Sequence, residues 1–172
     1  MTKKIIVLSG KQYSGKDTVA KILLEKLTGF RRVGIGDAIK LEYSKRTGLS
    51  VEEIEKNKAT YRPDLINLGN EGRAISDTYW LCALLNIEGN LIIPDMRLKK
   101  EYEFFTQQNA FTIRVNSTYE NRSKRGTVVK DDDITETDLD DITNWNFVIE
   151  NNSTYEELVK NTDLLIKKLQ HF

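Results

Sequence analysis

Residues 5–18 read IIVLSGKQYSGKDT. Ile5–Leu8 is a β-branched and aliphatic run, typical of a strand that is buried on both faces. Gly10–Thr18 has the glycine and lysine spacing of a phosphate-binding loop, and Val19–Leu27 continues with apolar residues at helical spacing. The glycines let successive backbone N–H groups turn toward an anion, and the helix N-terminus adds the positive end of its dipole. This strand, loop and helix therefore predict a site for the phosphates of a nucleoside triphosphate.

Within the loop, Lys16 is expected to contact the β- and γ-phosphates and to neutralise charge during transfer. Asp17 stands where Ser or Thr normally helps to hold Mg²⁺, and its carboxylate is also a hard oxygen ligand. The alternative is a glycine turn with a surface lysine, which the position between a strand and a helix disfavours. We expect Mg²⁺ and ATP as cofactors, and the residues expected to bind ATP are Gly10, Lys11, Ser14, Gly15, Lys16, Asp17 and Thr18.

Beyond the loop, short apolar runs alternate with amphipathic segments, which predicts an α/β fold with a parallel sheet and helices on both faces. Residues 1–172 are expected to form a single domain, because domains cluster near roughly 100–150 residues. Further strands are expected at 32–35, 91–93, 111–115 and 145–149. Further helices are expected at 37–46, 51–58, 63–73 (with Pro63 in the first turn), 79–87, 98–108 and 155–169.

Composition excludes several classes of chemistry. The chain has 26 Lys and Arg against 26 Asp and Glu, so no bulk cationic field attracts long nucleic acids. Its single cysteine, Cys82, allows neither an intrachain disulfide nor a cysteine-based zinc site. Its single histidine, His171, lies next to the last residue, which disfavours Ser-His and Cys-His catalysis. Ile5–Leu8 is too short for a signal peptide or a membrane span, so a cytoplasmic protein is expected (host cytoplasm if viral).

The loop segment Ser9–Thr18, with its Ser-Gly-Lys-Asp core, resembles two kinase families. These are the bacteriophage deoxynucleoside monophosphate kinases and the animal-type phosphomevalonate kinases. The other stretches resembling the phage kinases are Asp77–Trp80, Ile92–Arg97, Asp133–Glu136 and Phe147–Asn151. Those resembling the phosphomevalonate kinases are Tyr61–Arg73, Arg122–Gly126 and Asp132–Asn151. The resemblance implies a three-layer P-loop kinase fold, similar to that of nucleoside monophosphate kinases.

In both families ATP donates its γ-phosphoryl group to a phosphate already present on the acceptor. The Tyr79-Trp80 and Pro94-Asp95 pairs favour a nucleotide, whereas the charged region 116–133 favours phosphomevalonate. We expect Mg²⁺-dependent transfer to a deoxynucleoside monophosphate, with phosphomevalonate as the alternative acceptor. An ATP-binding regulator without a small-molecule acceptor is a further alternative, as is a kinase acting on DNA. Stable binding to nucleic acid or to a membrane is not expected, and the protein is expected to be a monomer or homodimer.

Phosphate contacts are expected beyond the carboxyl ends of the strands, where parallel α/β sheets bind their ligands. Arg97 follows the strand at 91–93 and is the strongest candidate for an acceptor or transition-state arginine. Asp95 lies between this strand and Arg97 in the sequence, and it is a candidate for the acceptor site and for orienting Mg²⁺. The alternative is a surface ion pair between Asp95 and Arg97. Asp37 and Lys40 are acceptor-site candidates by resemblance, with Asp37 as a helix cap the competing interpretation. Arg73 is a weaker candidate for the same site.

The charged segment 116–133 resembles the lid of monophosphate kinases, which closes to exclude water. Arg122 and Arg125 are its candidate catalytic residues, and Gly126 is a candidate hinge. A solvated basic loop is the alternative. The acidic residues between 131 and 141, Glu136 among them, are expected to be mostly solvated.

Overall fold

The computed structural model describes residues 3–172. The chain divides into two compact units, the first made of Met1–Arg32 with Gly89–Phe172 and the second made of Val33–Glu88. The first unit contains the sheet and the phosphate-binding loop, and the second is helical. Each unit is described separately below.

The sheet of the first unit has five strands in the order β2-β3-β1-β4-β5, and its neighbouring strands all run parallel. The central strand β1 pairs with β3 and β4, so that Ile6 lies opposite Ile92 on one side and Phe111 on the other. All five residues of β1 are buried, as expected for a strand covered on both faces. The strands are β1 (Ile5–Ser9), β2 (Phe30–Arg32), β3 (Asn90–Met96), β4 (Phe111–Asn116) and β5 (Phe147–Glu150).

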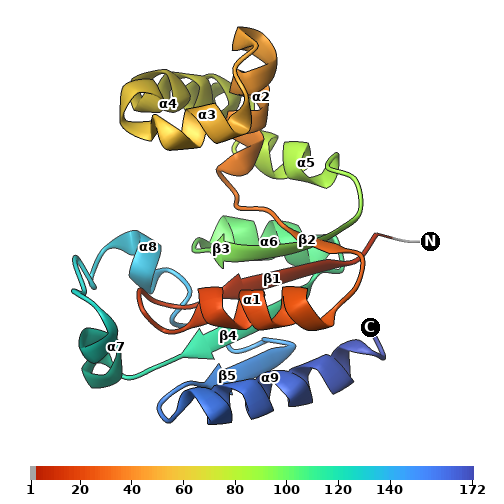
Figure 1. Cartoon of the computed structure of the whole chain (residues 1–172), viewed down its shortest axis with the longest axis vertical. Helices are drawn as coiled ribbons and strands as arrows, with labels where there is room; N and C mark the ends of the chain where they lie inside the picture. The colour runs from red at the N-terminus through yellow and green to blue at the C-terminus, as the bar shows by residue number, and fades with distance from the viewer. Residues whose placement is uncertain (1–2) are drawn as a thin grey trace. The chain divides into compact units, whose positions relative to one another are not determined.

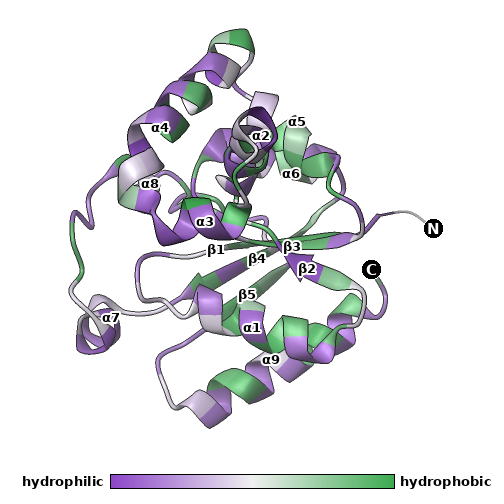
Figure 2. Ribbon diagram, turned by 45° about the horizontal axis from the view of Figure 1, so that its top comes forward, coloured by the Kyte–Doolittle hydropathy of each residue, from purple (hydrophilic) through white to green (hydrophobic). Residues whose placement is uncertain are grey.

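Helices cover both faces of this sheet. Figures 1 and 2 show α1 and α9 side by side on one face and α6 on the other. Green and purple segments interchange along α1 and α9 in Figure 2, as expected for helices with one apolar face. Val19, Leu23, Leu158 and Leu165 join the strands in one buried cluster. The helices are α1 (Lys16–Lys26), α6 (Lys99–Gln107), α7 (Tyr119–Arg125), α8 (Ile134–Thr137) and α9 (Tyr155–Leu169).

The second unit is built around α4 (Lys58–Ile75), which packs against α2 (Asp37–Thr47), α3 (Val51–Lys56) and α5 (Tyr79–Leu85). Trp80 of α5 is buried, and its indole N–H donates to the Gly69 carbonyl at 3.0 Å. Glycine at position 72 permits this approach, because a Cβ there would lie 2.4 Å from the indole nitrogen. Trp80 is therefore a core residue.

The expected α/β architecture is confirmed, but several boundaries differ. The strand expected at 91–93 extends over Asn90–Met96, so Asp95 lies within β3. β2 lies at Phe30–Arg32 rather than at 32–35, because its pairing with β3 begins at Phe30 opposite Asn90. Helix α4 begins at Lys58, before Pro63, because the Asn57 carbonyl accepts N–H groups of the first turn. The charged segment 116–133 contains a helix, α7. In the part of the chain that the structure covers, the helices are all too short or too polar to cross a membrane.

Candidate active site

The phosphate-binding loop connects β1 to α1 through two residues with positive φ. Tyr13 has φ of 58° and Gly15 has φ of 101°. Gly10 lies where a Cβ would be 2.4 Å from the Ser14 hydroxyl and 2.5 Å from the Val115 carbonyl oxygen. A side chain at position 10 would therefore force the loop away from β4, which explains the need for glycine there.

Lys16 begins helix α1 and is 6% exposed. Burial lowers the pKa of its ammonium group below the usual value, because the charged form loses water. The carboxylates of Asp17, Glu136 and Asp95 oppose this shift, whereas the charge of Arg97 adds to it. A buried lysine at the N-terminus of a helix, next to a loop of turned N–H groups, is suited to bind an anion.

Two buried polar atoms beside the loop have no hydrogen-bond partner in the described part of the chain. They are Oγ of Ser14 and Nε of Arg122. Unpaired buried groups of this kind cost free energy unless a ligand satisfies them. A cavity of about 380 Å³ opens at the loop, and its lining residues are Gln12, Tyr13, Gly15, Lys16, Asp17, Thr18 and Arg125. Ser14 and Arg122 are not among these lining residues, but Lys16, Arg125 and the loop backbone that line the cavity fit a polyphosphate.

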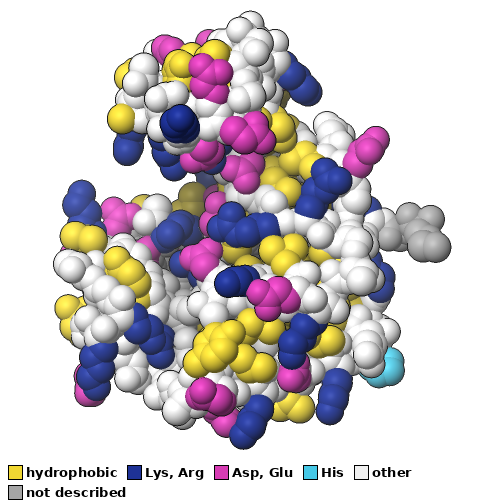
Figure 3. Space-filling view, in the orientation of Figure 1, with side chains coloured by type: hydrophobic (Ala, Val, Ile, Leu, Met, Phe, Trp, Pro, Cys, Tyr) yellow, Lys and Arg dark blue, Asp and Glu magenta, His cyan; other side chains and the backbone are white. Residues whose placement is uncertain are grey.

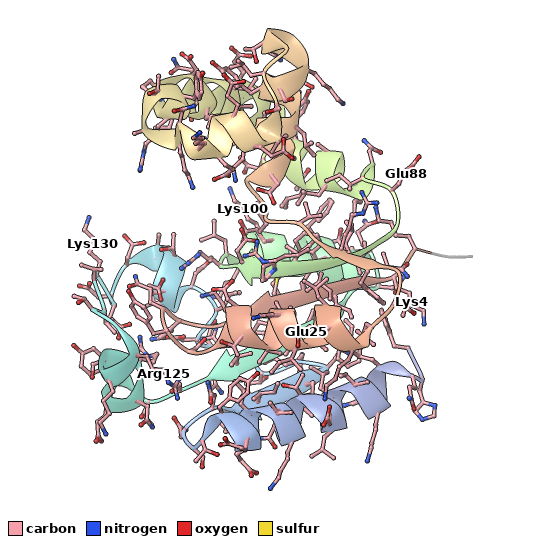
Figure 4. All side chains as sticks on the ribbon, viewed as in Figure 1. Lys4, Glu25, Glu88, Lys100, Arg125 and Lys130 are labelled. Atoms are coloured by element: carbon pink, nitrogen blue, oxygen red, sulfur yellow. The ribbon has the colours of Figure 1, made fainter. Side chains whose placement is uncertain are left out.

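Arg122 and Arg125 reach the loop from helix α7. Arg122 is buried, binds both carboxylate oxygens of Asp131 at 2.7 and 2.9 Å, and contacts the Gln12 carbonyl. Arg125, labelled in Figure 4, donates to the Tyr13 carbonyl at 3.1 Å and to the Asn151 carbonyl at 2.8 Å. The two arginines from the expected lid therefore lie against the phosphate-binding loop in this structure.

Gly126 follows these arginines and packs on the loop. A Cβ at this position would lie 2.2 Å from the ring of Tyr13. Its φ of 176° is ordinary extended backbone, so close packing, and not backbone conformation, accounts for the glycine.

Arg97 follows β3 and is fixed by two glutamates. Its backbone N–H donates to Glu101 at 2.8 Å, and its guanidinium forms an ion pair with Glu136. The arginine side chain stays 33% exposed, whereas that of Glu136 is 1% exposed. The backbone of Arg97 is therefore held in place, while its guanidinium group stays partly accessible to solvent. Asp95 lies near enough to Lys16 and Glu101 to influence both of their pKa values.

Glu136 was expected to be solvated, and the structure corrects this. It also accepts the backbone N–H of Gln12, in the phosphate-binding loop, at 2.7 Å. Asn151 is a second residue with an unexpected contact, because its side-chain amide donates to the Ser14 carbonyl at 2.8 Å. Asp133 and Glu136 have the spacing of a helix capping box, but the Asp133 N–H donates to the Lys130 carbonyl, so this spacing gave no signal for the contacts of the Glu136 side chain. Asp133 does cap α8, accepting the Thr135 N–H at 2.9 Å.

A second cavity, of about 570 Å³, lies beside the loop and is lined in part by Lys11, Arg114, Asp140 and Trp145. Asp140 pairs with Lys11 at 2.8 Å and with Arg114 at 2.7 Å, so its single negative charge lies between two cations. Acidic and basic side chains are intermingled on the face shown in Figure 3. Lys11 is the one loop residue that lines the larger cavity, whereas the smaller cavity is lined by Gln12, Tyr13 and residues 15–18, and so fits the phosphates better.

The remaining acceptor-site candidates lie in the second unit. Asp37 accepts the Gly34 N–H at 2.6 Å and pairs with Lys40 at 2.8 Å, and Lys40 also pairs with Glu55. Burial lowers the pKa of Lys40, but hydrogen bonds to the two carboxylates outweigh it and raise the pKa overall. Its charge is thus compensated within the unit. Arg73 contacts the neutral side chain of Asn70 at 2.8 Å, which leaves its charge uncompensated by that contact.

The candidate metal ligands are Asp17 and Asp95. Asp17 is 67% exposed and lies 3.2 Å from Arg32. Across residues 3–172, no group of three or more His, Cys, Asp and Glu side chains is arranged to hold a metal ion. Two carboxylates beside a phosphate site still fit Mg²⁺, which commonly binds through one or two carboxylates together with substrate phosphates.

A parallel sheet with this loop, a buried lysine at the start of α1 and Arg125 at the cavity are the features of a P-loop kinase, a class of enzymes that use ATP, and the family comparison supports this class. A family model described as "Phosphomevalonate kinase" matches residues 8–111 of the 172-residue chain, and the chain belongs to this family. The phosphomevalonate kinase of Drosophila melanogaster is 29% identical over 187 aligned residues, covering 97% of each chain.

Solved structures support the fold. Shikimate kinase from Aquifex aeolicus is 21% identical, with a TM-score of 0.52, and the match covers 96% of this chain and 98% of that one. Shikimate kinase from Acinetobacter baumannii, in complex with shikimate, is 18% identical, with a TM-score of 0.56 and coverage of 97% and 94%.

These comparisons correct the expected acceptor. The family model and the fly relative are both phosphomevalonate kinases, so the preference for a deoxynucleoside monophosphate was wrong. The resemblance to phage kinases gains no support, whereas the resemblance to phosphomevalonate kinases is confirmed.

Proposed function

We propose that this kinase transfers the γ-phosphoryl group of ATP to the phosphate of phosphomevalonate, giving ADP and diphosphomevalonate. The family match over residues 8–111 carries this proposal, because it includes both the phosphate-binding loop and Arg97. The shikimate kinases share the fold but are named for a different acceptor, so the fold alone leaves the acceptor open.

The transfer breaks the bond between the γ-phosphorus and the β,γ-bridging oxygen and forms a bond from γ-phosphorus to an acceptor phosphate oxygen. In this proposal the loop N–H groups, the Ser14 hydroxyl and Lys16 bind the β- and γ-phosphates. Because Lys16 is buried, its charge acts on the transferring group with little screening by water. Gly10, Lys11, Gly15 and Thr18 complete the ATP site. Mg²⁺ held near Asp17 and Asp95 would supply charge neutralisation at the phosphate oxygens.

Arg97, Arg122 and Arg125 are the proposed catalytic arginines. Two phosphate groups must approach each other during transfer, and guanidinium groups reduce their repulsion while staying charged at neutral pH. Both terminal nitrogens of Arg122 bind Asp131 in this structure, so Arg122 would have to exchange this carboxylate for a phosphate during transfer. Residues 1–172 would act as one kinase domain with the segment 116–133 as its lid.

Asp37, Lys40 and Arg73 are the proposed acceptor-side residues. Of the two cations, Arg73 is the better phosphate ligand, because Lys40 is already paired with two carboxylates. Asp37 would then act mainly by fixing the start of α2, through its bond to the Gly34 N–H.

The experiment measures ADP release with ATP and Mg²⁺ in the presence of single acceptors. Phosphomevalonate should stimulate ADP release well above the rate without acceptor. Mevalonate tests the need for an acceptor phosphate, and shikimate and the deoxynucleoside monophosphates serve as unrelated acceptors. Stimulation by one of these instead of phosphomevalonate would overturn the proposal. Slow hydrolysis that no acceptor stimulates would instead indicate an ATP-binding regulator.

A matched pair of variants tests the loop. Lys16→Ala should lower the transfer rate by roughly 100-fold or more, because Lys16 acts on developing charge. Lys21→Ala changes an exposed lysine of the same helix and should leave the rate unchanged. Equal rates for the two variants would remove Lys16 from the mechanism.

A further inference from the structure

A single buried carboxylate joins the phosphate-binding loop to Arg97. Glu136, on α8, has a side chain that is 1% exposed. Its Oε2 accepts the Gln12 N–H at 2.7 Å, and its Oε1 pairs with Nη1 of Arg97. Both carboxylate oxygens are therefore engaged, each with a different part of the active site.

This arrangement has a clear energetic requirement. Burying a carboxylate is costly unless it is both paired and hydrogen-bonded, and Glu136 meets both conditions only when the loop and Arg97 are in place. Lys16, Arg114 and Arg122 also lie near enough to interact with this charge, but the direct partners of the carboxylate are Arg97 and the Gln12 N–H. Losing either direct partner would leave one carboxylate oxygen without it, so the three groups favour a single arrangement.

The side chain of Gln12 is held by the same part of the chain. Its amide nitrogen donates to the Val129 carbonyl at 2.8 Å, and its amide oxygen accepts the Val129 N–H at 3.2 Å. With Glu136 on its backbone N–H, Gln12 is fixed at both ends by the segment 129–136. The position of the loop thus depends on this segment.

Arg97 is held by contacts that leave part of its guanidinium available. Glu136 and the Thr135 carbonyl both contact Nη1, and Glu101 fixes the backbone. A guanidinium has further N–H groups on Nη2 and Nε, and the side chain remains 33% exposed. Arg97 can therefore bind a phosphate with these groups while Glu136 keeps its orientation fixed.

We propose that Glu136 is a positioning residue for phosphoryl transfer: it orients Arg97 and fixes the phosphate-binding loop without touching either substrate. This inference rests on the proposed function, in which Arg97 contacts the phosphates. Fixing a charged group before the substrates bind avoids reorganisation during the reaction, and misplacement by about 1 Å can cost roughly 100-fold in rate.

The main test replaces Glu136 by glutamine. Glu136→Gln keeps the size of the side chain and an oxygen for the Gln12 N–H, but it removes the charge that holds Arg97. We expect kcat to fall roughly 10- to 100-fold while the KM for ATP changes by less than about threefold. Glu103→Gln removes an exposed carboxylate of α6, outside the proposed lid, and should leave kcat unchanged.

A double-mutant cycle tests whether Glu136 acts through Arg97. In an Arg97→Ala background, Glu136→Gln should have little further effect on kcat, because the group it positions is gone. An undiminished effect in that background would overturn the proposal. So would a loss of thermal stability in Glu136→Gln with kcat per folded molecule unchanged, which would indicate a purely structural role.

A measurement without any acceptor separates this inference from the proposed function. Hydrogen exchange of the Gln12 amide should be slow in the wild-type chain and in Glu136→Gln, and much faster in Glu136→Ala. If phosphomevalonate is not the acceptor, the kinetic cycle can be repeated on intrinsic ATP hydrolysis, with the same pattern expected. Fast exchange in the wild-type chain would refute the geometry, whichever acceptor is used.

Discussion

Replacing Gly15 by alanine should destabilise the fold by about 2–5 kcal/mol. Gly15 has φ of 101°, where an L side chain adds roughly 1–2 kcal/mol of backbone strain. The new Cβ would also lie 2.3 Å from Nδ2 of Asn151. That amide donates to the Ser14 carbonyl at 2.8 Å in a buried hydrogen bond. Displacing it would leave buried polar groups unpaired, which costs roughly 1–3 kcal/mol.

The assay is urea unfolding of the single and double variants. We expect the midpoints to shift while the slope of the unfolding free energy against urea concentration stays unchanged. In an Asn151→Ala background the collision is absent, so Gly15→Ala should cost only the strain, about 1–2 kcal/mol. The coupling between the two positions should then be about 1–3 kcal/mol. Gly36→Ala is the control, because a Cβ there meets nothing within 4 Å. An equal cost of Gly15→Ala in both backgrounds would refute the argument.

The buried lysine should make stability depend on pH. Burial lowers the pKa of Lys16 in the folded state, so between that pKa and 10.5 the unfolded chain binds more protons and stability rises with pH. Lys16→Met should abolish this rise in urea unfolding at increasing alkaline pH, and a retained rise would assign it to other groups. Burial raises the pKa of Glu101, although two backbone N–H groups that donate to its carboxylate oppose this shift. Between pH 4.5 and the raised pKa the folded chain binds more protons than the unfolded chain, so stability should fall as the pH increases. Glu101→Gln should flatten that fall in thermal unfolding, and an unchanged profile would contradict the assignment. Gly126→Ala should weaken ATP binding by displacing the Tyr13 ring, and calorimetry should show recovery when Tyr13→Ala is added. Failure of that recovery would exclude the collision as the cause.

The sequence alone predicted most of the fold, because its elements are marked by local patterns. The apolar runs at 5–8 and 111–115 became strands β1 and β4, and the amphipathic run at 155–169 became α9. The strand order had no local signal, since β1 pairs with strands that begin 85 or more residues later. The edge strand β2 was misplaced because its three residues form a strand only through pairing with β3.

The candidate site was predictable where chemistry is local and not where it depends on tertiary contacts. The loop at 10–18 was recognised from its glycines and lysine. Glu136 looked like one solvated carboxylate among several, because its burial depends on partners 124 and 39 residues away in sequence. Asn151 was seen only as part of a resembling stretch, and its contact with Ser14 spans 137 residues. The acceptor could not be derived from the loop, which serves any ATP-dependent transfer.

These long-range contacts have a consequence for how the protein is made. The loop at residues 10–18 leaves the ribosome early, but the groups that hold it (Arg125, Glu136 and Asn151) are translated more than 100 residues later. At about 5–20 residues per second, the nascent chain carries an intact motif for several seconds before its supports exist. The nascent chain should therefore bind nucleotide only after synthesis has passed position 151. Binding of ATP would then indicate that the last folding steps are complete.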